Sequence, residues 1–507
     1  MLSNPLPPSV ARLAPPLRSL AAALLIALFP VAAGAATIVV TSPDDTDPGA
    51  GGTCTLRQAI VSMNTGALAG SCANAGAAFG SGDTIHFAAS ALADAATPGT
   101  IALADSADAS GAVGGTLVVT GAELTIDGSA WRGGGAGQYT DGVTIVRPDG
   151  ANHRFGIVRD TAAAGGSLTL LGLSLGNGAA TDACERNGGG GICIPTADLH
   201  LIDSTISDGD AAYGAGIYGG SGTLTVAGST IRGGNAAYGG GIFSMSGTVM
   251  LDHSVLDGNV ANCGGAVATA GTLIANDSTI GNGAALRRGG GIFTTTGSIR
   301  VNRSRLVGND SYYGGGAILA KYAADITVAG STISGNHARY VGGGIASYGG
   351  TLSVTNSTIS GNSTFRGGGG IHANGTLSLR HATVSGNTTN GTGGGIDGDG
   401  GGAIDDSIVA GNAQASGDDI ALAGSWTGDH NLTSATGLDL GPLQDNGGPT
   451  PTMLPGSASA AIDAIPAQEC AEPTDQRGIA RPQGAGCDIG AVEIVVDVIF
   501  ADGFDGD

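Results

Sequence analysis

Residues able to do chemistry gather in the stretch NDSYYGGGAILAKY, residues 309–322. It contains Lys321, the only lysine among 507 residues, and three of the nine tyrosines. Ammonium and guanidinium groups neutralise a carboxylate, while amines, imidazoles and phenols exchange protons with a bound molecule. The same residue types recur on both sides of this stretch. They predict a site for an anionic polymer, with or without cleavage of a bond.

Cleavage beside a uronate carboxylate would require a cation, a base and an acid for the leaving oxygen. Lys321 or His337 would be the base, and Tyr313 or Tyr340 would be the acid. The cation would be supplied by Arg288, Arg339 or Arg366. The candidate catalytic residues are therefore Lys321, His337, Tyr313, Tyr340 and Arg339. The candidate binding residues are Tyr213, Tyr238, Arg287, Arg288, Tyr312, Tyr322, Tyr348, Arg366 and His372.

The charge distribution indicates the kind of partner. The whole chain has a formal net charge of −22, which disfavours nucleic acid as a partner. Between residues 287 and 380, nine arginine and lysine residues stand against Asp310 and Asp325, a local net charge of +7. Such a local positive field selects an anionic partner. Arg300 and Arg380 alternate with apolar residues and are expected on a different face.

Internal repeats define the elements that must position these residues. A GGGI phrase recurs at intervals of 25 to 27 residues, and a STISGN phrase recurs in step with it. Short runs of alternating apolar and polar residues within each repeat are typical of strands, and no helical periodicity interrupts them. The apolar anchors of the GGGI phrase are Ile192, Ile217, Ile242, Val267, Ile292, Ile318, Ile345, Ile371 and Ile396.

A unit of about 25 residues with three short strands and glycine turns predicts one coil of an all-β, single-stranded parallel β-helix. Equivalent residues of successive coils then form rows parallel to the axis. Tyr213, Tyr238, Cys263, Arg288 and Tyr313 follow at equal steps of 25 just before the anchors, and are expected in one row. The glycines after them are expected to form the floor of a groove, with Lys321 and Tyr322 on its other side.

A recurrent asparagine also predicts a row. Two explanations remain open: inward amides that hydrogen-bond from coil to coil, or residues that simply tolerate a left-handed turn. The asparagines are Asn235, Asn259, Asn282, Asn309, Asn336, Asn362, Asn387 and Asn412.

Three segments resemble known bacterial families. The paired repeats are similar to those of polymorphic outer-membrane proteins, which implies a right-handed β-helix. CTLRQAI, residues 54–60, resembles the CSLREA domain, departing at Thr55 and Gln58. Residues 440–493 resemble the choice-of-anchor Q domain. These resemblances imply a surface or extracellular location but no single activity.

The predicted organisation follows from the repeats and the resemblances. A short helix within residues 55–64 is expected to cap the first coil, and the anchor-like region to close the other end. The expected segments are a signal peptide, 1–36; a CSLREA-like cap, 37–105; a β-helix, 106–412, with regular coils at 188–412; a connection, 413–439; an anchor-like domain, 440–493; and an acidic tail, 494–507.

The apolar run that ends near Ala35 predicts a secretory signal, and no other apolar run is long enough for a membrane span. Secretion or attachment at the outer cell surface permits disulfides. The close pairs are Cys54 with Cys72, Cys184 with Cys193, and Cys470 with Cys487, which leaves Cys263 over.

No cofactor is firmly implied, although Asp397 and Asp399 in DGDGGG are weak candidate calcium ligands. Three functions remain open. The first is a module that binds an anionic polysaccharide or other cell-surface polymer, as an adhesin does. The second is a polysaccharide lyase, by analogy with similar right-handed β-helices. The third is a purely structural surface solenoid.

Overall fold

The computed structural model describes residues 35–45, 52–89, 99–104, 115–121, 123–130, 142–148, 157–162, 165–180, 184 and 187–495. The expected signal peptide and acidic tail lie outside this part of the chain, apart from residues 35–36 and 494–495. Across the described residues, every helix is too short or too polar to cross a membrane.

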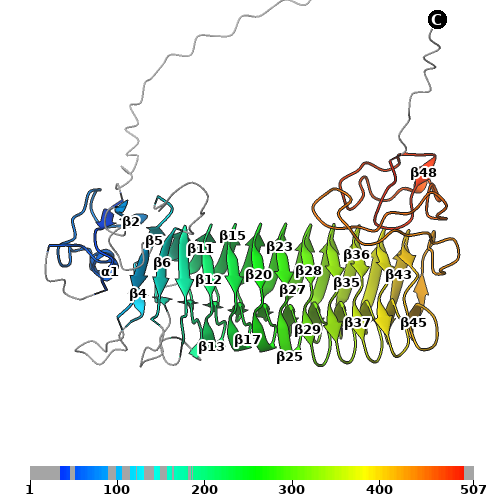
Figure 1. The fold of residues 1–507 in the computed structure, drawn as a ribbon, viewed down its shortest axis with the longest axis horizontal. Coiled ribbons are helices and arrows are strands. Elements are labelled where there is room, and N and C mark those ends of the chain that lie inside the picture. The colour runs from blue at the N-terminus through cyan, green and yellow to red at the C-terminus, as the bar shows by residue number, and fades with distance from the viewer. Residues whose placement is uncertain are drawn as a thin grey trace, which may run out of the picture.

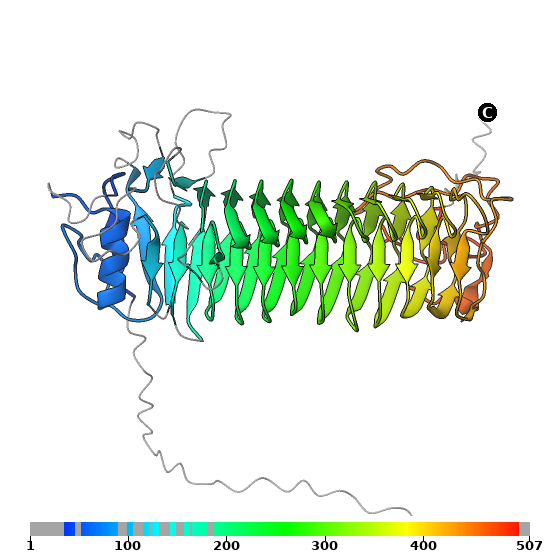
Figure 2. The same cartoon turned by 90° about the horizontal axis from the view of Figure 1, so that it is seen from below.

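The chain winds into an elongated parallel β-helix (Figures 1 and 2). One regular coil contains β14 (Ile217–Gly219), β15 (Thr223–Ala227), β16 (Thr230–Arg232) and β17 (Asn235–Tyr238) before β18 (Ile242–Ser244) begins the next. The fold class is the predicted one, but each regular coil has four strands and not three. The fourth strand lies between the recurrent asparagine and the glycines, in a segment that the sequence predicts to be a turn.

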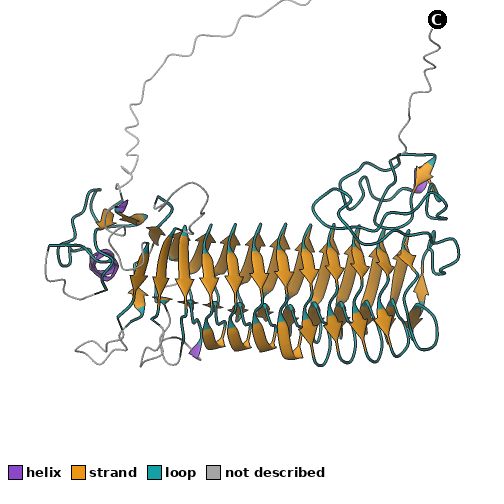
Figure 3. Ribbon diagram, in the orientation of Figure 1, coloured by secondary structure: helices purple, strands orange, loops and turns teal. Residues whose placement is uncertain are grey.

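Stacking of equivalent strands produces four parallel sheets (Figure 3). We call them sheets A, B, C and D, with 14, 12, 12 and 8 strands. Sheet A runs from β1 (Thr37–Val40) to β46 (Trp426–Thr427), sheet B from β3 (Thr100–Ala102) to β44 (Ile408–Val409), sheet C from β4 (Leu117–Val119) to β45 (Ile420–Leu422), and sheet D from β13 (Asp210–Tyr213) to β41 (Thr388–Thr389).

Period-2 alternation explains the core, because every second side chain of a strand points inward. The GGGI anchors pair coil to coil, as Ile192 does with Ile217 and Ile217 with Ile242, and all are fully buried. Gly315 shows why glycine precedes the anchor. Its φ is +60°, and an added Cβ would lie 2.1 Å from the Ile318 carbonyl oxygen.

The recurrent asparagines mostly form an internal ladder. Asn336 Nδ2 donates to Leu306 O at 3.0 Å and to Asn362 Oδ1 at 2.9 Å, while Asn336 Oδ1 accepts from the backbone of Asn309. Asn282 differs: it is left-handed, with φ of 50°, and Gly283 takes the ladder position. The two explanations therefore apply to different members of the row. Fully buried ladder members are Asn259, Asn309, Asn336, Asn362 and Asn387.

The N-terminal helix forms as the sequence predicts. α1 (Leu56–Thr65) begins with a capping box between Thr55 and Gln58 and ends at left-handed Gly66. Arg57 fixes the helix to the body, because its guanidinium pairs with Asp45 at 2.6 Å and donates to the backbone of residues 115 and 116.

The region after residue 440 does not simply close the end of the solenoid. It packs against the outer face of sheet B in the last coils (Figure 1). Outward threonines of β32 (Thr332–Ser334), β36 (Thr358–Ser360) and β40 (Thr383–Ser385) bond to Pro451, Gln476 and Ala491. Residues 413–439, expected as a connection, contain β45 and β46 and so extend the helix.

The three predicted disulfides are present, at Cys54–Cys72, Cys184–Cys193 and Cys470–Cys487. The last crosslinks the region that covers sheet B, where β47 (Ile465–Pro466) pairs with β48 (Gly486–Cys487). Cys263 carries a free thiol and is buried.

Candidate functional site

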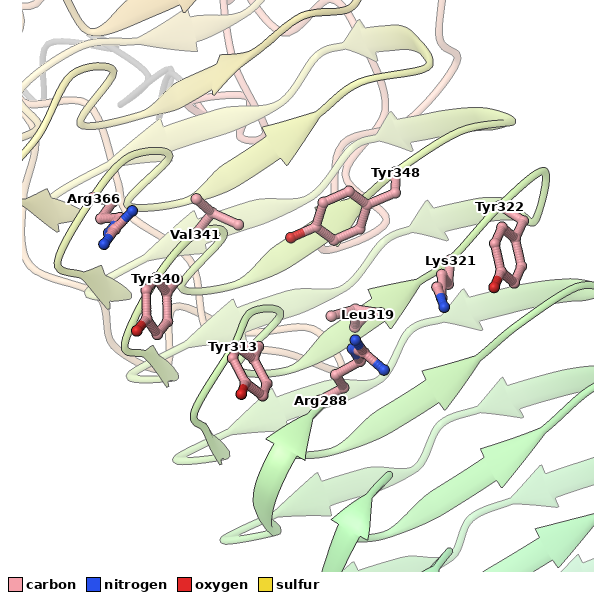
Figure 4. A pocket seen from close by; sticks show the side chains of 9 residues that line it. All are labelled: Arg288, Tyr313, Leu319, Lys321, Tyr322, Tyr340, Val341, Tyr348 and Arg366. Carbon is pink, nitrogen blue, oxygen red and sulfur yellow. The ribbon is translucent and has the colours of Figure 1, made fainter.

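A groove opens where sheet D turns into sheet C (Figure 4). It has a volume of about 490 Å³. Three cations and four phenol rings line it, and none of its described lining residues is acidic. The lining residues are Arg288, Tyr313, Leu319, Lys321, Tyr322, Tyr340, Val341, Tyr348 and Arg366.

Four successive coils contribute to the groove. Arg288 ends β25 (Ala284–Arg288), and Leu319 lies in β30 (Ile318–Ala320) with Lys321 directly after it. Tyr348 follows β34 (Ile345–Ser347). Since coils stack at roughly 4.8 Å, three steps between four coils give a site roughly 14 Å long.

The predicted row of side chains changes at this point. Tyr213, Tyr238, Cys263 and Arg288 are paired in register, but the next partner of Arg288 is Gly314, not Tyr313. The extra residue of this coil lies between β26 (Ile292–Thr294) and Ser298, because Thr269 pairs with Thr294 at a step of 25 and Thr272 with Ser298 at a step of 26. Tyr313 is therefore the equivalent of Arg287 and not of Arg288. From the coil of Arg288 onward, the turn from sheet D to sheet C holds two residues and not one, and in the next coil these are Tyr312 and Tyr313 at the edge of the groove.

The floor is apolar rather than made of glycine. Leu319 and Val341 lie between the two sides in Figure 4. Gly315 and its equivalents make the tight return before each anchor, so they take up the backbone turn and not the surface beneath a ligand. Leu319 is almost fully buried and Val341 half-buried, so the floor offers a small apolar contact and the exposed tyrosine rings offer the larger one.

Cations lie over the phenol rings. Arg366 Cζ is 4.7 Å from the ring centre of Tyr340. Arg288 Cζ is 5.8 Å from the ring centre of Tyr313. These two rings stack on each other at 5.7 Å. Cation–π contact holds the guanidinium groups in place without neutralising them, so their charge remains available to an anion.

Lys321 and Tyr322 form the opposite side. Lys321 Nζ lies 4.4 Å from the Tyr322 ring centre, and a hydrogen bond from this ammonium lowers the pKa of the Tyr322 phenol. Tyr322 has φ of 62°, and in the same turn of neighbouring coils the left-handed residues are glycines, Gly297 and Gly350, two positions later. A tyrosine in that conformation is strained, and such strain is common at functional sites. Burial raises the pKa of the nearby Tyr348 phenol.

Seven of the predicted site residues line the groove and seven do not. His337 pairs with Asp310 at 2.6 Å, and Arg339 stacks on Tyr312 at 4.9 Å. His372 pairs with Asp397 at 2.7 Å and contacts Tyr348, with ring centres 5.4 Å apart. The predicted residues outside the lining are His337, Arg339, Tyr213, Tyr238, Arg287, Tyr312 and His372.

Sequence reasoning missed Leu319 and Val341. A signal for Leu319 was present, because the residue after each anchor faces outward in sheet C and is mostly apolar. Phe243, Ala268, Phe293 and Leu319 are consecutive in this row. They pack with Cys263, whose thiol pKa burial raises, so this cysteine belongs to an apolar layer beside the groove.

The calcium candidates are not in the group of described acidic and histidine side chains whose ligand atoms converge. Asp397 is engaged by His372, and Asp399 does not group with it. The described residues whose ligand atoms do converge are Asp252, His253 and Asp277, within 4.8 Å of one another. Asp277 is already paired with Arg303, which lowers the pKa of its carboxyl group.

Comparison with known proteins yields a match of fold. A family model described as a right handed beta helix region matches residues 183–333. No curated protein and no solved structure matches the chain significantly. The matched residues include β25, β30 and Lys321, and thus most of the groove. The family match and the stacked coils together identify the fold as a right-handed parallel β-helix.

Proposed function

We propose that this protein binds an anionic polysaccharide in the groove, as a secreted or surface-attached module. The observation that carries the proposal is the lining: Arg288, Lys321 and Arg366 with phenol rings, an apolar floor and no acidic partner among the described lining residues. A uronate or sulfated sugar has a face that stacks on a ring and an acid group that binds a cation.

The groove direction supports a polymer over a compact ligand. Its lining residues come from four stacked coils, so it extends along the helix axis. A chain laid along that axis would meet Arg288 and Lys321 near one end and Arg366 near the other.

Titration calorimetry with alginate, pectate and glycosaminoglycans, and with neutral dextran for comparison, tests the proposal. Binding to an acidic polymer that weakens as salt increases is expected, because the contacts are largely ionic. Equal binding to dextran, or no binding to any acidic polymer, would contradict it.

A polysaccharide lyase is the second candidate, favoured by the Lys321–Tyr322 contact. A phenol with a lowered pKa beside an ammonium is suited to take the proton from the carbon next to a uronate carboxylate. The electron pair left on that carbon would form the double bond of the product. The glycosidic C–O bond would break, and an acid such as Tyr313 or Tyr340 would protonate the leaving oxygen.

Ultraviolet absorbance of the unsaturated product separates the two candidates. Absorbance that grows with time on a uronate polymer would establish cleavage. Retained binding without any absorbance change would exclude the lyase and support polysaccharide binding without cleavage.

A further inference from the structure

The turn outside the groove carries an exposed ridge of apolar and cationic side chains. The ridge consists of Leu286, Tyr312, Arg339 and Phe365. Each of them directly follows a residue that is paired in sheet D: Ala285, Ser311, Ala338 and Thr364, in the same order.

Exposure singles out this ridge. Leu286 is 69% exposed and Phe365 is 60% exposed, the two highest values among the large exposed hydrophobic side chains of the described residues. Both lie in one row across four coils, roughly 14 Å apart at 4.8 Å per coil. Solvent exposure of such side chains is normal when they are scattered, but their alignment in one row marks a contact surface.

The same turn is positively charged. Arg287 follows Leu286, Arg366 follows Phe365, and Arg339 lies over the Tyr312 ring. The nearby acidic side chain, Asp310, is paired with His337. Aromatic and aliphatic groups mixed with arginine are the composition that enters the headgroup zone of an anionic lipid layer.

The shape favours a lipid layer over a protein. The ridge is one residue wide in each coil and lies along the corner of the solenoid, on the lower edge in Figure 1 near β25, β29 (Asp310–Ser311) and β37 (Ser363–Thr364). A stable protein interface buries about 800 Å² on each partner and needs a broader complementary surface. A planar lipid surface accepts a narrow convex edge.

We propose that this ridge docks on an anionic lipid surface, with Leu286 and Phe365 entering between the headgroups and the arginines binding their phosphates. The apolar contacts of the ridge are separate from the proposed polysaccharide binding, because neither Leu286 nor Phe365 lines the groove, whereas Arg366 belongs to both surfaces. It would place the groove directly beside the lipid surface.

Flotation with vesicles tests the ridge. The full chain should float with vesicles of equal parts phosphatidylcholine and phosphatidylglycerol and much less with phosphatidylcholine alone. The double variant Leu286→Ser with Phe365→Ser should reduce the bound fraction about tenfold, because two apolar contacts are lost. High salt should also reduce it.

A matched control is available on other faces. Met250 is 37% and Val255 38% exposed, on sheets A and B, and their double serine variant should float as the unchanged protein does. Circular dichroism verifies the fold of each variant. Equal flotation of the ridge variant and the control variant would overturn the proposal. So would a concentration-dependent dimer that the ridge variant abolishes, since the ridge would then be a protein interface.

Discussion

At the residue scale, the single lysine has a defined setting. Lys321 stands at the end of β30, against the Tyr322 ring and opposite Arg288 and Arg366. Its ammonium has no carboxylate partner among the described residues that line the groove. A cation held by a ring is a better site for an incoming anion than one already paired with an acid.

Replacement of this ammonium tests both the charge and its effect on the phenol. Lys321→Met should weaken polyanion binding about three- to tenfold, the effect of one partly exposed charge. The pKa of Tyr322 should rise toward the ordinary value for a phenol, since its hydrogen bond from Lys321 is lost. Calorimetry measures the first effect and tyrosinate absorbance the second.

Arg300→Met is the matched control for the loss of charge. Arg300 lies outward on β27 (Ser298–Asn302) of sheet A, away from the groove. The control should bind as the unchanged protein does. A similar loss in both variants would mean that overall charge, and not the groove, governs binding.

The contributions of the ring face and of the hydroxyl group of a stacked tyrosine to binding can be measured separately. Tyr313→Phe should preserve binding because the stacking face and the contact with Arg288 remain, whereas Tyr313→Ala should weaken it several-fold. Affinity measurements on the two variants decide this. Loss of cleavage but not binding in Tyr313→Phe would instead support the acid role in a lyase.

At the element scale, the sheets position the groove and the asparagine ladder fixes the stacking. The ladder amides satisfy backbone groups where sheet B passes into sheet D, inside the coil and out of reach of water. Removal of one buried amide from this row of hydrogen bonds is costly in free energy, because its former partners lose their hydrogen bonds.

Asn336→Ala should therefore lower the free energy of unfolding by about 2–4 kcal/mol. Asn235→Ala is the control, because Asn235 occupies a related place in an earlier coil but is exposed, and it should change stability by less than about 0.5 kcal/mol. Denaturant unfolding measures both. Equal effects would show that the ladder hydrogen bonds of Asn336 do not contribute to stability.

At the scale of the whole molecule, the C-terminal region is joined to the last coils around His381. This side chain is fully buried, lies 3.5 Å from Asp406, and has its pKa lowered to about 3, by burial first and then by Arg481 and Arg380. The folded protein binds fewer protons here than the unfolded chain. Stability is therefore complete above the ordinary histidine pKa of 6.5 and is lost as the pH falls from there toward 3.

Asp488 in the same region acts in the opposite direction. Burial raises the pKa of its carboxyl group to about 6, so its contribution to stability declines as the pH rises from 3.8 to 6. His381→Asn isolates the histidine effect: the loss of stability between pH 6.5 and 3 should shrink by roughly 3–5 kcal/mol. Unfolding curves across this range measure it.

His253→Asn provides the control. His253 has a similar left-handed φ, 47° against 45° for His381, but is exposed on the surface of an earlier coil. Its replacement should leave the pH dependence unchanged. An unchanged slope in His381→Asn would place the acid sensitivity elsewhere.

The sequence determined the fold because its signals are local and repeated. Period-2 alternation, glycines before each anchor and a constant spacing each predict stacked coils, and the capping box at Thr55 predicts the helix that covers the first of them. Once the spacing is known, the rows that carry Arg288, Lys321 and Tyr348 follow, as does their place on one side of the solenoid.

Only the tertiary structure decided which side chains share the groove. One extra residue between β26 and β27 shifts Tyr313 out of the row of Arg288. His337 and His372 pair with acids and do not line the groove. The packing of the C-terminal region on sheet B likewise depends on contacts between segments more than 100 residues apart. Spacing along the chain encodes a row, but whether a side chain faces a groove or a partner depends on local insertions and distant neighbours.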